Sequence, residues 1–353
     1  MLPTQEAPYQ IIKGDALEVM RGLPDNSINL IATDPPYYKV KDEQWDRQWE
    51  TPEGFLSWMD ELAQEWQRIL KPNGSLYVFA SPQMAYHVEG VIRKYFNVLN
   101  RIIWEKSEVS YMAKYETFLR QFVPMSEQII FAEHFGSDNI AKGESGYAVK
   151  SDELRGFLFT PIRDWFVESW NKSGLTRAQV DEACKTSNVT QYWFLERNYQ
   201  IPTPEKYAIL QQLAPNAFTR NYESLRQEFE SLRRPFNATI QDTHSDVWHY
   251  QSVSAYNGKH PCEKPAPMME HIVSMSSNPD DIVLDCFMGS GATGAAAGKL
   301  GRKFIGVDSS EKYYRKAYQR IVTAYRHFEK LGDVGKLSAS SFEGLPLFSN
   351  GGG

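Results

Sequence analysis

Two short segments, far apart in the chain, carry the residues best suited to chemistry. The first, Asp34-Pro35-Pro36-Tyr37, directly follows the apolar run INLIAT. Proline cannot donate to a strand ladder, so a strand must end there. A carboxylate and a rigid proline carbonyl can together accept both hydrogens of a planar amino group, and Tyr37 offers a flat face for stacking a base. The tetrapeptide could also be no more than a strand stop.

The second segment is a glycine-rich turn after the apolar residues 282–284, running from Asp285 to Gly294 as DCFMGSGATG. Its glycines match GxGxxG, and Asp308 ends the next apolar run, where an acid can bind ribose hydroxyls. A nicotinamide or flavin site and a turn without a ligand are therefore both alternatives. Asp285 favours a third ligand, because a carboxylate repels a pyrophosphate but attracts the ammonium and sulfonium of S-adenosylmethionine.

The elements around these segments alternate between strand and helix. Strands are predicted over 9–13, 28–33, 75–80, 98–104, 128–132, 282–284 and 303–307, and helices over 16–23, 52–70, 83–95, 264–276, 290–300 and 309–325. This rhythm predicts an α/β layered fold with a largely parallel sheet. At the carboxyl edge of such a sheet, a turn like Asp34–Tyr37 lies where ligands bind.

The middle of the chain differs from this pattern, because strand signals fade and aromatic residues become frequent. We predict four parts: a catalytic half over 1–136, an inserted, mostly helical domain over 137–246, a cofactor half over 247–330 and a flexible tail over 331–353.

Composition excludes several classes of protein. The formal net charge of −6 argues mildly against a passive nucleic-acid coat, and three cysteines without a CxxC pair argue against a zinc or disulfide framework. No apolar run approaches the roughly 20 residues of a membrane helix, and the start lacks a signal pattern. We therefore expect no membrane and a reducing cytoplasm.

In their order and spacing, these motifs resemble the β group of amino-directed DNA methyltransferases, in which the Asp-Pro-Pro-Tyr half precedes the Phe-x-Gly-x-Gly half. The segment HPCEKP (260–265) resembles the stretch that opens the cofactor half, and IKGDAL (12–17) resembles the opening strand with its acid. The resemblance covers roughly residues 9–135 and 247–325. Less firmly, the insert resembles those of phage and prophage enzymes.

The resemblance implies a Rossmann-like, S-adenosylmethionine-dependent methyltransferase fold with a mixed, mostly parallel sheet, acting on double-stranded DNA without a metal. It implies that the cofactor is lined by Asp285, Phe287, Gly289, Ser290, Gly291 and Thr293, with Asp308 on the ribose, Asp15 near the adenine and Lys264 near the methionine end. The target base would be flipped out of the duplex. Tyr37 would stack on it while Asp34 and Pro35 accept its amino hydrogens, on the turn that Pro36 completes.

Several alternatives stay open. Asp at the first position favours adenine N6, whereas cytosine N4 enzymes more often carry Ser. Pro261-Cys262 mimics the nucleophile of cytosine C5 enzymes, but we interpret Cys262 as structural. A DNA-binding regulator with an inactive core is a second class of function, and a glutamine or RNA methyltransferase is a third.

Residues 176–196 can form a helix, turn and helix, with Thr176 as the first N-cap. A second helix exposing Asn188, Thr190, Gln191 and Arg197 could enter a major groove; alternatively, Tyr192, Trp193 and Phe194 form the core of an ordinary helical hairpin. Further candidate DNA contacts are Tyr38, Lys39 and Lys41, in a polar loop that could close over the base, and the pair Arg233 and Arg234. The recognition word, a homodimer and a restriction partner stay undetermined.

Overall fold

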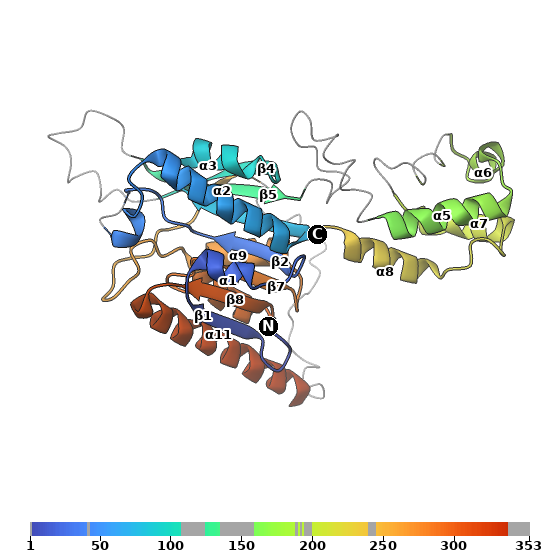
Figure 1. Ribbon diagram of the computed structural model, residues 1–353. Helices are drawn as coiled ribbons and strands as arrows, with labels where there is room; N and C mark the ends of the chain where they lie inside the picture. Colours follow the sequence, from blue (N-terminus) through green and yellow to red (C-terminus); the bar gives the residue numbers. More distant parts are fainter. Residues whose placement is uncertain are drawn as a thin grey trace, which may run out of the picture.

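A computed structural model describes residues 2–40, 43–106, 124–134, 159–187, 190, 193, 200–238 and 245–337 of the 353-residue chain. The described residues form one eight-stranded sheet between two layers of helices, with a separate group of helices to one side (Figure 1). The strands are β1 Tyr9–Lys13, β2 Ile28–Thr33, β3 Leu70–Ala80, β4 Asn97–Glu105, β5 Ser126–Glu133, β6 Val247–His249, β7 Ile282–Asp285 and β8 Lys303–Asp308.

The sheet order β1-β8-β7-β2-β3-β5-β4-β6 places strands from the two ends of the chain beside one another. β2 pairs with β7 in parallel, with Leu30 opposite Val283 and Ile31 opposite Leu284. β5 is antiparallel to both β3 and β4, so the sheet is mixed, as predicted. Because β2 and β7 are parallel neighbours, their carboxyl ends meet at the same edge of the sheet.

Each face of the sheet is covered by helices from one half of the chain. The first face packs against α1 Ala16–Arg21, α2 Pro52–Ile69 and α3 Ala85–Ile92. The second face packs against α9 Ala266–Ser276, α10 Ala292–Lys299 and α11 Glu311–Leu337. Both cores are apolar and buried, so the sheet is the rigid floor on which the loops at its edge are held.

The longest helix of the first layer shows how local sequence defines an element. The Thr51 hydroxyl caps α2 by accepting from the Gly54 amide, and Pro52 occupies the first helical turn, where its missing N–H costs nothing. Apolar residues at helical spacing then face the sheet, ending with the fully buried Trp66 and Ile69. The sequence therefore predicted this helix to within one residue.

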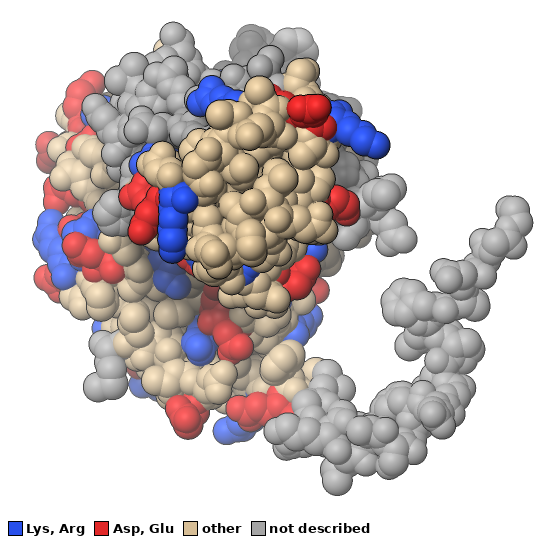
Figure 2. Space-filling view, turned by 90° about the vertical axis from the view of Figure 1, so that its right-hand side faces the viewer, with Lys and Arg blue, Asp and Glu red and all other residues tan. Residues whose placement is uncertain are grey.

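The middle of the chain forms a helical group with its own core. It contains α5 Thr160–Ser173, α6 Arg177–Ala183, α7 Pro204–Leu213 and α8 Tyr222–Leu232, packed around buried aromatics such as Phe166, Tyr207 and Phe218. Thr176 caps α6 in a capping box with Gln179, which confirms the predicted N-cap. Figure 2 looks toward this group and shows a mainly uncharged end, with charged side chains around its rim.

Three features differ from the sequence prediction. β3 begins at Leu70, so Lys71–Gly74 belong to a strand whose register with β2 shifts there, not to a turn. The short edge strand β6 pairs with β4 and was not predicted. α11 continues to Leu337, so the predicted tail from 331 begins too early. Among the described helices, none is both long and apolar enough to span a bilayer.

Candidate active site

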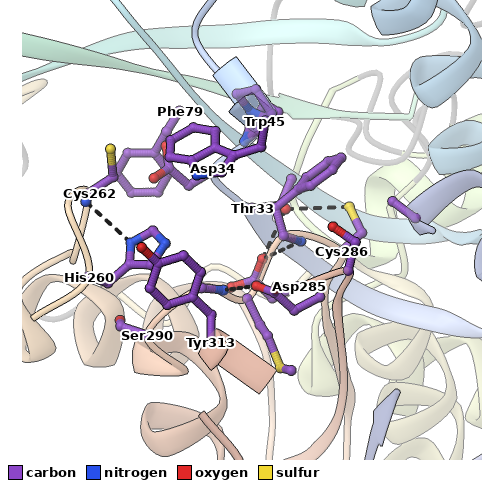
Figure 3. Close-up of a pocket in the computed structure, with 18 of the residues that line it drawn as sticks. Thr33, Asp34, Trp45, Phe79, His260, Cys262, Asp285, Cys286, Ser290 and Tyr313 are labelled. Atoms are coloured by element: carbon purple, nitrogen blue, oxygen red, sulfur yellow. Dashed lines mark hydrogen bonds between the residues drawn. The ribbon is translucent and has the colours of Figure 1, made fainter. Parts of the chain in front are cut away.

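The two chemistry-bearing segments lie on one pocket at the carboxyl edge of β2 and β7 (Figure 3). The pocket is lined by both the Asp34–Tyr37 turn and the loop from Asp285 to Thr293, although some 250 residues separate them in sequence. The Thr33 hydroxyl joins the two strands by donating to Asp285 Oδ1 at 2.9 Å. The fold thus confirms that these distant stretches meet.

Asp34 uses its two carboxylate oxygens differently. Oδ2 accepts from the Lys264 ammonium at 2.7 Å, whereas Oδ1 is buried and has no hydrogen-bond partner among the described residues. A buried, unpaired carboxylate oxygen is costly unless a ligand supplies the donor. Asp34 Oδ1 is therefore the atom in this turn that is best prepared to accept a hydrogen from a bound amine.

Lys264 and Glu127 surround this carboxylate with a buried charge cluster. The Lys264 ammonium donates to Tyr37 Oη at 3.0 Å and lies 3.0 Å from Glu127 Oε2, which also accepts from Tyr37 Oη–H at 3.0 Å. The other oxygen of Glu127 accepts from Lys106. The lysine predicted at the methionine end of the cofactor lines the pocket and, in this structure, contacts the Asp34–Tyr37 turn.

The two carboxylates on Lys264 have opposite pKa shifts, and their partners explain why. Burial raises the pKa of Asp34, and Lys264 offsets this only in part because that ammonium is shared with Glu127. Burial alone would also raise the pKa of Glu127, but the ammonium groups of Lys264 and Lys106 together lower it to about 2. Asp34 is thus the more basic of the two carboxylates.

The glycine-rich loop begins with a buried carboxylate and contains a glycine that packs closely against α11. Asp285 accepts from the Thr293 hydroxyl at 2.6 Å and from the Phe287 amide at 3.2 Å, and burial raises its pKa to about 6. Gly291 has φ +75°, and a Cβ there would lie 2.9 Å from the Ala317 backbone. Only glycine suits that position, because it needs a left-handed conformation and leaves no room for a side chain.

The remaining predicted cofactor residues line the same pocket. Asp308 accepts from the amides of Gly289 (3.0 Å) and Ser310 (2.8 Å), while burial raises its pKa to about 6. Asp15 caps α1 by accepting from the Glu18 amide at 3.1 Å. Ser290 lies against Arg320 and also lines the pocket.

The loop after the Asp34–Tyr37 turn is folded back onto it. The fully buried Asp46 accepts from the Tyr37 amide at 2.6 Å through its carboxylate and from the Lys39 amide at 2.7 Å through its carbonyl. Tyr38 and Lys39 both have positive φ, near +60°, a strained conformation that such tertiary contacts must hold. Trp45 from this loop stacks on His260 with ring centroids 6.3 Å apart, so the two halves also meet above the pocket.

The residues predicted to contact DNA differ in their exposure, and some of them lie outside the described residues. Lys39 is exposed and donates to the Glu50 carbonyl, and Tyr38 is half-buried against Phe55. Lys41, Asn188, Gln191 and Arg197 lie outside the described residues. Thr190 is buried, at 1% exposure, so the prediction that it is exposed for base contact is wrong. Trp193 is also buried in the helical core, as the hairpin alternative expected.

The two arginines after α8 differ sharply. Arg233 is partly exposed and pairs with Glu230 at 3.3 Å. Arg234 is buried and pairs with the fully buried Glu133 at 2.6 Å, and Glu133 also accepts from Asn97. A guanidinium enclosed in this way cannot reach a phosphate, so the predicted DNA contact of Arg234 is wrong. Its role is to fix the end of the helical group to β5.

Sequence reasoning missed four residues of this site: Glu127, Asp46, Trp45 and His260. Glu127 had a signal, since a charged residue directly before the buried run QIIFA needs a partner.

Cys262 lines the pocket, and its amide donates to His260 Nδ1 at 3.2 Å. Among the described residues, no group of three His, Cys, Asp or Glu side chains could hold a metal ion.

The fold, with a ligand pocket where strands from the two halves meet, defines the class as a Rossmann-like, S-adenosylmethionine-dependent methyltransferase. A family model of DNA methylases (N6_N4_Mtase) matches residues 28–319, and the chain belongs to this family. The carboxylates of Asp285 and Asp308, which both line the pocket, fit a cationic cofactor held against a turn. Gly291, predicted to line the cofactor, is not among the lining residues, and its missing side chain makes room for Ala317 of α11.

The chain is similar to proteins of named activity. It is 27% identical to the DNA adenine methyltransferase YhdJ of Escherichia coli over 92% of this chain and 87% of that protein. It is 24% identical to the type II methyltransferase M.HinfI of Haemophilus influenzae over 88% and 67%. Among solved structures, the cytosine-N4-specific PvuII DNA methyltransferase matches with a TM-score of 0.50 at 14% identity, covering 92% and 93%, a likeness of fold.

Proposed function

We propose that the protein is a site-specific DNA adenine N6-methyltransferase of the β group, and that Asp34, Pro35, Pro36 and Tyr37 form its catalytic turn. The observation that carries the proposal is the buried Asp34 Oδ1, which finds no hydrogen-bond partner in the described part of the chain and lies on the same pocket as the Asp285–Thr293 loop. An acceptor that lacks a donor suits an incoming amino group.

In the proposed reaction the adenine is flipped from the duplex at a cost of a few kcal/mol. Tyr37, whose ring is fixed by its amide and its hydroxyl, stacks on the base. Asp34 Oδ1 and the Pro35 carbonyl accept the two amino hydrogens and orient the nitrogen lone pair. S-Adenosylmethionine, held beside Asp285 and Asp308, would supply an electrophilic methyl group to this nitrogen, with the neutral thioether of the cofactor as the leaving group.

The residues of the chain then act by position and charge. Asp285 and Asp308 provide negative charge and acceptors for the cofactor, and Asp15 approaches its adenine end. After attack the amine must lose a proton. The raised pKa of Asp34 makes its carboxylate the better proton acceptor of the two that contact Lys264. Since the nitrogen itself is the nucleophile, no covalent bond to the enzyme forms.

Adenine is favoured over cytosine because Asp stands at position 34 and because a relative over most of the chain, YhdJ, is named an adenine methyltransferase. Cytosine N4 is the alternative within the family. We propose that the helical group over 159–232 and the loop around Lys39 contact the DNA. Methylation-sensitive long-read sequencing of a host expressing the chain tests the proposal: modified adenines should recur in one short word and vanish with Asp34→Ala. Modified cytosines instead would reject it.

A further inference from the structure

Glu127 is a buried carboxylate near the reacting centre that is outside the pocket lining. Its side chain is 12% exposed and lies on β5, the strand that runs antiparallel to its neighbours. Its Oε2 accepts from Tyr37 Oη–H and from Lys264 Nζ, each at 3.0 Å, and its Oε1 accepts from Lys106. A buried carboxylate with these partners holds other side chains and cannot itself touch a base in the pocket.

The contacts of Lys264 define what Glu127 holds. An ammonium has three hydrogens, and three acceptors surround Lys264 Nζ: Asp34 Oδ2, Tyr37 Oη and Glu127 Oε2. With every donor engaged, the ammonium has one position. The cluster of Asp34, Glu127, Lys264 and Lys106 is formally neutral, since two carboxylates balance two ammonium groups. Without Glu127 it would carry a buried excess of one positive charge.

We propose that Glu127 is a positioning residue for methyl transfer. It fixes the Lys264 ammonium and the Tyr37 hydroxyl. Asp34 Oδ2 then stays hydrogen-bonded to Lys264, and Asp34 Oδ1 is left to accept from the amino group. The inference rests on the proposed function of Asp34 and adds to it a residue of β5, a strand separated from β2 by β3.

The same arrangement sets the basicity of Asp34. Burial and the negative charge of Glu127 raise the pKa of Asp34, and Lys264 lowers it. Replacing Glu127 by a neutral residue leaves Lys264 acting on Asp34 alone, so the pKa of Asp34 should fall. The charged and titratable groups around this cluster are Tyr37 and Asp46 on the catalytic loop, Cys262 and Lys264 before α9, Glu127 on β5, Lys106 after β4 and Asp285 on β7.

Glu127→Gln in the full chain tests the proposal by steady-state kinetics on duplex DNA between about pH 5 and 9. We expect kcat near neutral pH to fall about 10- to 100-fold, because small displacements of positioned groups cost that much. The KM for S-adenosylmethionine should stay within about threefold. The acid limb of kcat should move to lower pH, because Asp34 stays ionised further into acid.

Glu105→Gln is the matched control. Glu105 lies on the neighbouring strand β4, is 57% exposed and contacts the exposed His249 at 2.9 Å. Its replacement should leave both kcat and the pH profile unchanged. A purely structural role of Glu127 would lower the folded fraction or the rate at every pH without moving the acid limb, and that result would overturn the proposal.

If Glu127→Gln does not fold, Glu127→Asp tests the positioning role instead. It retains the charge but withdraws the carboxylate from Tyr37 Oη, so kcat should fall with the acid limb in place. A wild-type kcat for Glu127→Asp would overturn the proposal. The two levels of failure are distinguishable: a wild-type chain that methylates no amino group rejects the proposed function, whereas an active wild type with a fully active Glu127→Gln rejects only the role of Glu127.

Discussion

At the scale of single residues, Asp34 carries the proposed chemistry, and its role can be separated from its contribution to folding. Asp34→Ala should lower kcat about 10²- to 10³-fold, the usual cost of losing one positioned electrostatic group. The fold should persist, because Lys264 keeps Glu127 and Tyr37 as partners. Isothermal titration should show S-adenosylmethionine binding within about threefold of wild type; lost binding would place Asp34 in the cofactor site instead.

The acids of the cofactor half predict a pH dependence of binding. Burial raises the pKa of Asp285 and of Asp308 to about 6. Both are ionised above that pH and become neutral below it, and in the proposed binding mode only the ionised forms attract the cationic cofactor. Affinity for S-adenosylmethionine should therefore be flat above about pH 7 and fall roughly tenfold per pH unit below about pH 6 for each acid that must be ionised.

Titration calorimetry from about pH 5 to 8 measures this dependence, with Asp308→Asn as the comparison. That variant should bind more weakly at neutral pH and lose affinity less steeply in acid. An affinity that does not change across the range would mean that neither acid faces the cofactor.

At the scale of elements, the junction between the helical group and the sheet depends on the Arg234–Glu133 pair. Arg234→Met should lower the free energy of unfolding by about 3–5 kcal/mol, because it leaves the Glu133 carboxylate buried without its guanidinium. Arg233→Ala, at the exposed neighbour, should cost less than about 1 kcal/mol. Chemical denaturation of both variants measures the difference in stability. Equal losses of stability would contradict the burial of Arg234.

Replacing Gly291 and Gly90 by alanine should change the free energy of unfolding in opposite directions. Gly291→Ala should destabilise the protein by about 2–4 kcal/mol, because φ is +75° and the new Cβ would meet the Ala317 backbone. Gly90→Ala should stabilise it by about 0.5–1 kcal/mol, because Gly90 lies in the interior of α3 and no described atom outside the helix backbone comes within 4 Å of the added Cβ. Thermal melts compare the two, and a stable Gly291→Ala would mean that the turn can open.

Most helices and strands could be predicted from local sequence patterns because their own residues determine them. The capped, amphipathic α2 and the β-branched strand β2 are encoded within their own residues. β6 was missed because three exposed or half-buried residues become a strand only by pairing with β4. The start of β3 was missed because Lys71–Gly74 has turn chemistry. These four residues lie at an irregularity between Leu70 and Ser75, which pair with Ile28 and Leu30 of β2, and the strand continues across it.

At the scale of the whole molecule, the sequence motifs predicted the main residues of the site, whereas the contacts among them depend on the fold. Asp34 and Asp285 could be identified from sequence, since each follows a buried strand and precedes a turn. The bonds from Glu127 to Tyr37 and from Asp46 to the Tyr37 amide could not, because they depend on which strands become neighbours. Arg234 was misjudged for the same reason, since an arginine pair in sequence does not reveal which member is buried.

The central claim is that two distant parts of the chain form one centre that methylates the amino group of a DNA base. The most direct measurement incubates the protein with methyl-labelled S-adenosylmethionine and unmethylated duplex DNA, then identifies the labelled nucleoside by mass spectrometry. The account predicts label in N6-methyldeoxyadenosine, lost with Asp34→Ala. Label at carbon 5 of cytosine, or no transfer to DNA, would contradict it.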